Sequence, residues 1–146
     1  MISVENLWKI ARSRWADARA LHDAGRHGGA IYLCGYSVEL ALKARICRTL
    51  SWAGWPETAS EFGQLKCLKT HDLPTLLRAS GVEILIKSEG GLLTRAWVII
   101  SEWDPERRYK VPDQDATLPK AAATLVAAGM LMEYLEHDRG PGHSAP

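Results

Sequence analysis

The chain has 146 residues, which is enough for one domain with a substantial core and too few for two comfortable domains. Its 18 Lys and Arg residues are balanced by 17 Asp and Glu residues, and this net charge of +1 excludes attraction of the whole molecule to nucleic acid or to a membrane surface. No apolar run approaches the roughly 20 residues of a membrane-spanning helix, and early charged residues leave no signal-peptide pattern. Three cysteines without Cys-x-x-Cys spacing indicate a reduced protein with free, buried thiols, so we expect a cytoplasmic location.

Helical periodicity dominates the first third of the chain. Apolar residues recur at steps of four and three from residue 3 to residue 24, with Ser3 as the expected N-cap and Gly25 as the expected end. A second helix is predicted to begin between residues 27 and 30 and to end near residue 50. It is apolar almost all the way round, which predicts a place inside a bundle.

The middle of the chain predicts shorter elements. The segment 51–70 is too long for a structureless connection in a compact domain. We therefore expect a functional lid or a short helix that has Pro56 in its first turn and continues through residues 61–65. Asp72 is positioned to cap a following short helix, with Pro74 in its first turn and Gly81 at its end.

The last third predicts two further helices. An apolar pattern runs from Leu85 to Trp103, with a possible break at the glycine pair 90–91, and a polar loop is expected over residues 107–116. The final helix is expected to begin after Thr117. It should turn five residues inward: Leu118, Ala122, Leu125, Met132 and Leu135.

No strand, repeat or linker is evident in the sequence. We therefore predict an all-α fold, an up-and-down bundle of four long helices with one or two short ones. This single domain spans residues 1–138, and residues 139–146 are predicted to form a disordered tail.

The second helix carries four polar residues at steps of four, three and four: Tyr32, Tyr36, Glu39 and Lys43, here called the polar stripe. This spacing places all four on one helical face. One interpretation, which we favour, is a purely structural ion pair between Glu39 and Lys43, one helical turn apart. The other is a pocket in which the tyrosines stack on a base, Lys43 contacts a phosphate and Glu39 orients Lys43.

Two further segments offer polar chemistry. His71 precedes the capped helix, where it either satisfies a backbone group or acts as an acid or base. The run Arg107, Arg108, Tyr109 and Lys110 offers cationic and aromatic surface for phosphates and bases, unless nearby acidic residues make it an ordinary solvated loop. We expect no metal and no cofactor, because the nearest histidine pair, His22 and His27, lacks a third partner at a useful spacing.

Three motifs in order give the chain a resemblance to a known family. They are the segment 30–44 ending in Glu39-Leu-Ala-Leu-Lys43-Ala44, the segment Thr70-His71-Asp72-Leu73 with Leu76-Leu77, and Trp103-Asp-Pro-Glu-Arg-Arg-Tyr109 before an Ala-rich last helix. In these motifs the chain resembles the HEPN domain (higher eukaryotes and prokaryotes nucleotide-binding), and the likeness spans nearly the whole sequence.

The resemblance implies an up-and-down helical bundle that often forms a dimer. It also implies either an RNase toxin, a partner of a nucleotidyltransferase-like protein in a toxin–antitoxin pair, or a module that binds nucleotide or RNA. Catalytic family members carry an Arg followed after four to six residues by a His. No Arg in this sequence meets a His at that spacing; Arg95, for example, reaches Ile100, Ser101 and Glu102.

We therefore expect a homodimeric HEPN-like protein that binds RNA, a nucleotide or a cognate partner such as a nucleotidyltransferase-like protein, without a membrane role. The expected ligand-binding residues are Tyr36, Glu39, Lys43, Arg107, Arg108, Tyr109 and Lys110. The alternative is a divergent, metal-independent endoribonuclease toxin in which His71 works with Arg107 or Arg108. A third interpretation is a protein–protein interaction module that uses an exposed region around Trp52 and Trp55.

Overall fold

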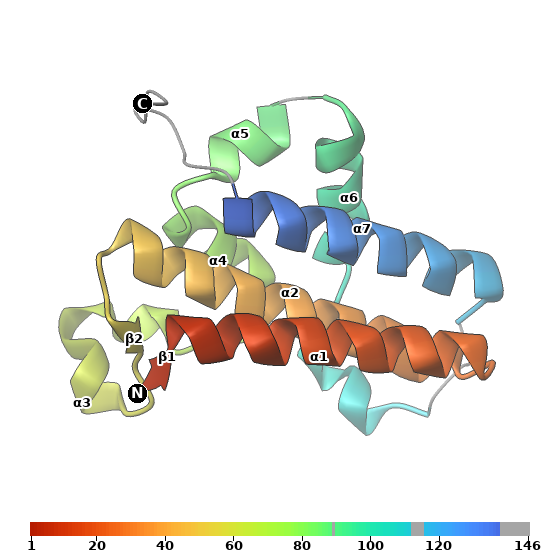
Figure 1. Cartoon of the computed structure of the whole chain (residues 1–146), viewed down its shortest axis with the longest axis horizontal. Helices are drawn as coiled ribbons and strands as arrows, with labels where there is room; N and C mark the ends of the chain where they lie inside the picture. The colour runs from red at the N-terminus through yellow and green to blue at the C-terminus, as the bar shows by residue number, and fades with distance from the viewer. Residues whose placement is uncertain (89, 112–115, 138–146) are drawn as a thin grey trace.

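The computed structural model describes residues 1–88, 90–111 and 116–137, and the predicted tail lies outside these residues. The all-α helical bundle is confirmed (Figure 1). Three long helices run side by side: α1 (Val4–Asp23), α2 (His27–Thr49) and α7 (Leu118–His137). The fourth, α6 (Leu92–Ser101), is only half as long and crosses α7 steeply (Figure 1).

Shorter elements surround these four helices. They are α3 (Ala59–Phe62), the 3₁₀ helix η1 (Gly63–Leu68), α4 (Leu73–Ala79), α5 (Glu83–Ser88) and the 3₁₀ helix η2 (Pro105–Tyr109). The buried apolar residues of all the long helices form one connected core. No helix among the described residues is long and apolar enough to cross a membrane.

The first two helices begin and end close to the predicted residues. The side chain of Ser3 accepts a hydrogen bond from the backbone N–H of Asn6, as an N-cap should. Gly25, with φ of +76°, turns the chain into α2, and a side chain would be strained in that conformation. The resulting helical hairpin is the frame on which the other elements pack.

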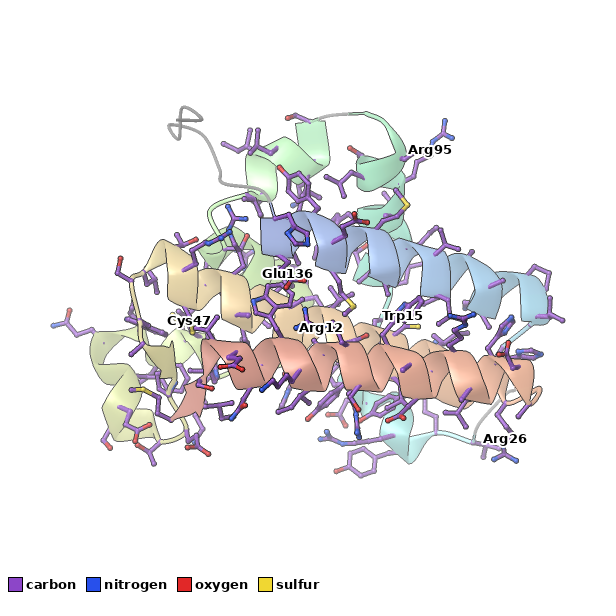
Figure 2. The ribbon with its side chains drawn as sticks, in the orientation of Figure 1. Arg12, Trp15, Arg26, Cys47, Arg95 and Glu136 are labelled. Atoms are coloured by element: carbon purple, nitrogen blue, oxygen red, sulfur yellow. The ribbon has the colours of Figure 1, made fainter. Side chains whose placement is uncertain are left out.

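Polar side chains fasten α7 to α1 and α2. The indole of Trp15 donates to the carbonyl oxygen of Leu125 at 3.0 Å, and Arg12 pairs with Glu136 at 2.8 Å in the space between α1 and α7 (Figure 2). The buried Arg45 of α2 donates to the carbonyl oxygen of Leu135. Leu135 lies in the last turn of α7, where backbone carbonyls lack a partner within the helix, so Arg45 satisfies one of them.

The inward face of α7 is largely as predicted, with one error. Leu125, Met132 and Leu135 are buried, and Ala122 is half-buried. Leu118 was expected to turn inward but is 59% exposed. It lies in the first turn of α7, beyond the end of the core that the neighbouring helices cover.

The cysteine prediction holds for two of the three residues. Cys34 and Cys47 are free and buried in α2, and burial raises the pKa of their thiols to about 12 and about 11. Both therefore stay protonated at neutral pH. Cys67 is exposed, which corrects the expectation that all three thiols are buried.

Two short strands that the sequence did not predict tie the N-terminus to the α2–α3 connection. β1 (Ile2–Ser3) pairs antiparallel with β2 (Gly54–Trp55). A side chain at Gly54 would collide with the backbone of Ile2, so the close pairing requires glycine there.

The aromatic residues of this connection pack inward. The ring of Trp55 lies 5.4 Å from that of Phe62 and 5.9 Å from that of Trp52, in edge-on geometry. Trp55 is buried and Trp52 is half-buried. The interpretation of this pair as an exposed contact surface is therefore wrong, because the two rings complete the core beneath α3.

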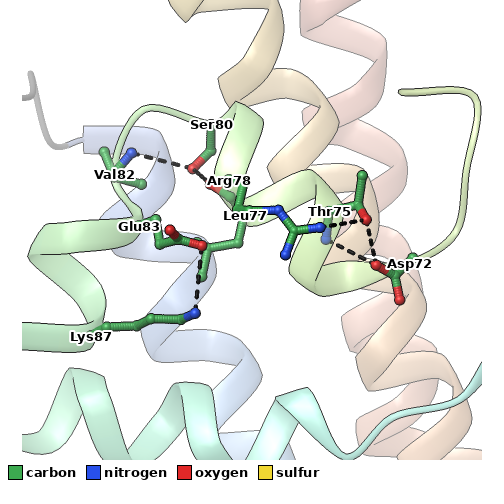
Figure 3. A network of polar contacts seen from close by, with 8 residues as sticks. All are labelled: Asp72, Thr75, Leu77, Arg78, Ser80, Val82, Glu83 and Lys87. Atoms are coloured by element: carbon green, nitrogen blue, oxygen red, sulfur yellow. Dashed lines mark hydrogen bonds and ion pairs between the residues drawn. The ribbon is translucent and has the colours of Figure 1, made fainter. Parts of the chain in front are cut away.

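Helix α4 begins as predicted at a cap. The carboxylate of Asp72 accepts from both the backbone N–H and the hydroxyl of Thr75, at 3.0 and 2.6 Å (Figure 3). Arg78 in turn donates to the Thr75 hydroxyl at 3.1 Å. The helix ends at Ala79, just before Gly81.

The apolar pattern that begins at Leu85 is divided as the glycine pair suggested. Helix α5 ends at Ser88, Gly90 adopts a φ of +71°, and α6 then runs to Ser101. The expected polar loop begins instead with the 3₁₀ helix η2, which Asp104 caps by accepting from the backbone N–H of Glu106.

Candidate functional site

The polar stripe of α2 lies on a face that is only partly covered. Most of α2 is buried on all sides, as its composition predicted, but Tyr32, Tyr36 and Lys43 are half-buried. Glu39 is the exception within the stripe, since it is only 1% exposed. A buried carboxylate is stable only with charged or hydrogen-bonding partners, so its partners define this site.

One oxygen of Glu39 gathers two basic groups. Its Oε1 accepts from Nζ of Lys43 at 2.6 Å and lies 2.8 Å from Nδ1 of His71. The Lys43 contact is the predicted pair one helical turn away. His71 comes from the segment before α4, thirty-two residues further along the chain. Its side chain is 51% exposed, against 12% for Lys43.

The contact with Glu39 gives His71 a defined chemical form. An ionised carboxylate can only accept hydrogen bonds, so the Nδ1 atom of His71 donates to Glu39. A neutral imidazole then keeps its lone pair on Nε2, the nitrogen on the far side of the ring from Glu39. The interpretation of His71 as a simple backbone cap is wrong, since Asp72 caps α4 and His71 binds the carboxylate.

Lys43 is enclosed more fully than the sequence suggested. Its ammonium group lies 5.3 Å from the ring centroid of Trp55, in addition to its bond with Glu39. The second oxygen of Glu39, Oε2, is buried and has no hydrogen-bond partner among the described residues. Lys43 therefore compensates the buried charge of Glu39, and its ammonium is less available to a ligand than the half-exposed ring of His71.

The other end of the stripe is covered by the segment after α6. Trp103 lies against Gly35 so closely that a side chain at Gly35 would overlap the indole ring. The indole donates to the carbonyl oxygen of Tyr32 at 3.0 Å, and its ring lies 6.2 Å from that of Tyr32. The two glycines near the stripe leave no open space beside it, because Trp103 fills the position at Gly35 and the β1 backbone fills the position at Gly54.

Of the basic run in η2, Arg108 is the residue that reaches the stripe. Its guanidinium lies 4.9 Å from the ring centroid of Tyr109. Hydrogen bonding with Tyr109, and to a smaller extent with Tyr32, raises the pKa of Arg108. Arg108 therefore joins the aromatic surface of η2 to the first residue of the stripe.

The other members of the run lie apart from the stripe. Lys110 is exposed and lies 3.8 Å from Asp104, and Tyr109 is exposed apart from its contact with Arg108. Arg107 is half-buried, and its side chain contacts no residue of the stripe among the described interactions. Of the four residues from Arg107 to Lys110 that were predicted to act together, Arg108 is the one with an interaction with α2 among the described residues.

Tyr36 links the two halves of this surface. Burial raises the pKa of Tyr36, and the negative charge of Glu39 raises it further, followed by a smaller contribution from Tyr32. The positive charges of Arg108 and Arg14 lower it. Tyr36 therefore lies within electrostatic range of Glu39 and of two arginines.

Arg14 of α1 is the residue of this surface that sequence reasoning missed. Its position was visible in the sequence, because Leu7, Ala11, Arg14 and Ala18 recur at steps of four, three and four. The other three members of this row are fully buried. A charged residue in a row that faces a neighbouring helix was the signal that the sequence offered.

Metal chemistry has no support in the described residues. The Nδ1 atoms of His22 and His27 lie 3.2 Å apart at the α1–α2 turn, which fits a hydrogen bond between the rings. No group of three His, Cys, Asp or Glu residues that could hold a metal ion occurs in the described part of the chain. The chemistry that this surface offers is proton transfer at His71 and the binding of anions and aromatic rings.

Comparisons with known proteins returned no relative. No family model matches the chain, and no curated protein or solved structure matches it significantly.

Proposed function

We propose that this chain is a HEPN-like domain that binds RNA or a nucleotide on the face formed by the polar stripe, His71 and Arg108. The observation that carries the proposal is that two segments, the one before α4 and η2, meet the polar stripe on one face of α2. Glu39 gathers Lys43 and His71 around one oxygen, and η2 brings Arg108 to Tyr32 and Tyr36 at the other end.

This surface has the chemistry of nucleic-acid binding without base specificity. Half-buried tyrosine rings offer stacking surface, and base–aromatic stacking is tolerant of sequence. Arg108 supplies a planar guanidinium of the kind that binds phosphate oxygens with two hydrogen bonds. Because Lys43 is held by Glu39 and Trp55, we assign direct ligand contact to His71 and Arg108 and a supporting charge to Lys43.

A titration with labelled RNA and mononucleotides over a salt series tests the proposal. Arg108→Gln is expected to weaken RNA binding about tenfold at low salt and to reduce the salt dependence by about one phosphate contact. The matched control is Lys9→Gln, which removes an exposed, helix-borne positive charge far from the stripe. Absence of binding by the unaltered protein at low salt, or equal losses in the two variants, contradicts the proposal.

A second candidate function is metal-independent RNA cleavage, and the Glu39–His71 contact is the observation that favours it. A half-exposed imidazole with Nδ1 held by a buried carboxylate keeps Nε2 ready to accept a proton from a ribose hydroxyl. Incubation of RNA with the protein in the presence of a chelator tests this activity. Cleavage that His71→Ala abolishes supports the candidate, and intact RNA after prolonged incubation contradicts it.

The partner that we propose is a second copy of the chain, paired through the outer face of α6. Leu92 and Val98 are 68% and 58% exposed there, and Ile99 lies beside them. Such apolar surface on a short helix is typical of a protein contact. A nucleotidyltransferase-like protein in a toxin–antitoxin pair is the heterologous partner that we propose, and co-purification of one stoichiometric protein tests it.

A further inference from the structure

We propose that Arg14 of α1 completes a phosphate subsite with Tyr36 and Arg108, so that one phosphate group of the ligand is held between two arginines from different elements. This inference rests on the proposed function and deepens it, because it names the residues that hold the phosphate. Neither the helical pattern of α1 nor the resemblance assigned a role to Arg14.

The register of the α1–α2 hairpin places Arg14 opposite Tyr36. At the turn, the side chain of Leu21 lies 3.1 Å from the position that a Cβ on Gly29 would occupy. The two helices run antiparallel, so moving seven residues back from Leu21 along α1 and seven forward from Gly29 along α2 covers two turns in each. These steps lead to Arg14 and Tyr36, respectively.

Arg14 has donors that its ion pair does not use. Asp17 accepts from Nη2 of Arg14 at 3.2 Å. The Nε atom is buried and has no hydrogen-bond partner among the described residues. Because the side chain as a whole is 42% exposed, a phosphate oxygen can reach the terminal N–H groups of the guanidinium and not the buried Nε.

Arg108 lies within electrostatic range of the same tyrosine. The η2 helix packs against α2, and hydrogen bonding with Tyr32 contributes to the raised pKa of Arg108. The ring of Tyr32 lies 6.3 Å from that of Tyr36. The positive charges of both arginines act to lower the pKa of Tyr36, in agreement with this arrangement. The Tyr36 hydroxyl offers a further donor to an anion that the two guanidinium groups bind.

The acidic groups nearby leave this subsite positive toward a ligand. Glu39 is committed to Lys43 and His71 and is buried away from solvent. Glu106 lies 3.8 Å from Arg108, a distance at which an exposed pair contributes little. Asp17 accepts from Nη2 of Arg14. A phosphate can therefore compete for the exposed N–H groups of the two arginines.

Calorimetric titration of the full chain with adenosine 5′-monophosphate, adenosine and inorganic phosphate tests the subsite. Arg14→Gln is expected to weaken the binding of the monophosphate about tenfold and to leave the affinity for adenosine unchanged. Arg14→Lys keeps the charge and is expected to give an intermediate loss of affinity for the monophosphate. The matched control is Arg19→Gln, the same change at an exposed position of the same helix. Thermal unfolding of each variant verifies that the fold is retained.

The outcomes separate this inference from the function on which it rests. If the unaltered protein binds the monophosphate and Arg14→Gln behaves like Arg19→Gln, the subsite is overturned while the proposed function stands. Equal affinity for adenosine and for the monophosphate also overturns it. If the unaltered protein binds neither the monophosphate nor RNA, both the subsite and the proposed function fail.

Discussion

At the scale of single residues, Gly35 determines how closely the segment after α6 packs on α2. It lies in the middle of α2, where glycine is unfavourable for a helix by roughly 1 kcal/mol relative to alanine. Its missing side chain allows the indole of Trp103 to lie directly on the helix backbone and to bond with the Tyr32 carbonyl. The position of η2, and with it that of Arg108, depends on this close approach.

We therefore expect Gly35→Ala to destabilise the protein by about 1–3 kcal/mol, the usual cost of overpacking, despite the better helix propensity of alanine. Gly129→Ala in α7 is the matched control. A Cβ at that position would lie 3.5 Å from Trp15, an ordinary contact, so this change is expected to stabilise by up to ~1 kcal/mol. Urea unfolding monitored by tryptophan fluorescence measures both effects, and the same sign of change in the two variants contradicts the interpretation.

The contacts of Glu39 show which residue pairs a sequence can predict. The pair with Lys43 follows from a spacing of four residues in a helix. The contact with His71 joins residues 39 and 71, and no local rule links them. To predict the contact between Glu39 and His71, one would need to know how the chain runs from α2 to α4. That path depends on the two short strands and on the aromatic core beneath α3.

At the scale of elements, the cap of α4 holds His71 in place. Helix α4 has seven residues, so it depends on packing and on its cap, because short helices are marginal on their own. Asp72 accepts two hydrogen bonds from Thr75 and directly follows His71 in the chain. The local order of the His71 segment is therefore coupled to the order of the first turn of α4.

Asp72→Ala is expected to lower the free energy of unfolding by ~1 kcal/mol and to weaken RNA binding as well, because His71 loses its fixed position. Asp72→Asn is the control, since asparagine caps helices about as well as aspartate. Denaturant unfolding and the RNA titration supply the two measurements. A loss of affinity in Asp72→Asn as large as that in Asp72→Ala shows that the charge of Asp72 matters and not the cap.

The two strands and the 3₁₀ helix η2 escaped prediction. The strands β1 and β2 have two residues each, so neither shows an alternating pattern. Their pairing joins residues about fifty positions apart and depends on the fit of Gly54 against Ile2. The 3₁₀ helix η2 escaped for a different reason, because the charged residues after Pro105 are typical of a loop.

At the scale of the whole molecule, the outer face of α6 carries a charge pattern suited to self-pairing. Arg95 and Glu102 lie seven residues apart on the face that exposes Val98 and Ile99, and neither forms an ion pair within the described part of the chain. Arg95 points away from the bundle (Figure 2). In an antiparallel pair centred between Val98 and Ile99, Arg95 of one copy faces Glu102 of the other.

Reversing these charges tests the homodimer and its surface together. Arg95→Glu alone and Glu102→Arg alone are each expected to weaken dimerisation about tenfold or more, because like charges then face each other, and the double variant is expected to restore it. Arg19→Glu, at an exposed position of α1, is the control for net charge. Sedimentation equilibrium measures the dissociation constants. A monomeric unaltered protein, or a double variant no tighter than the single variants, contradicts the pairing.

Periodicity, caps and the helical repeat act between residues close in the chain, so they were enough to predict the class of fold, the approximate bounds of α1, α2 and α7, and the pairing of Glu39 with Lys43. The contacts of His71 with Glu39 and of Trp103 with Gly35 follow instead from how distant segments pack. Each of these contacts depends on the register between packed elements, which is fixed by the fit of many side chains across the core.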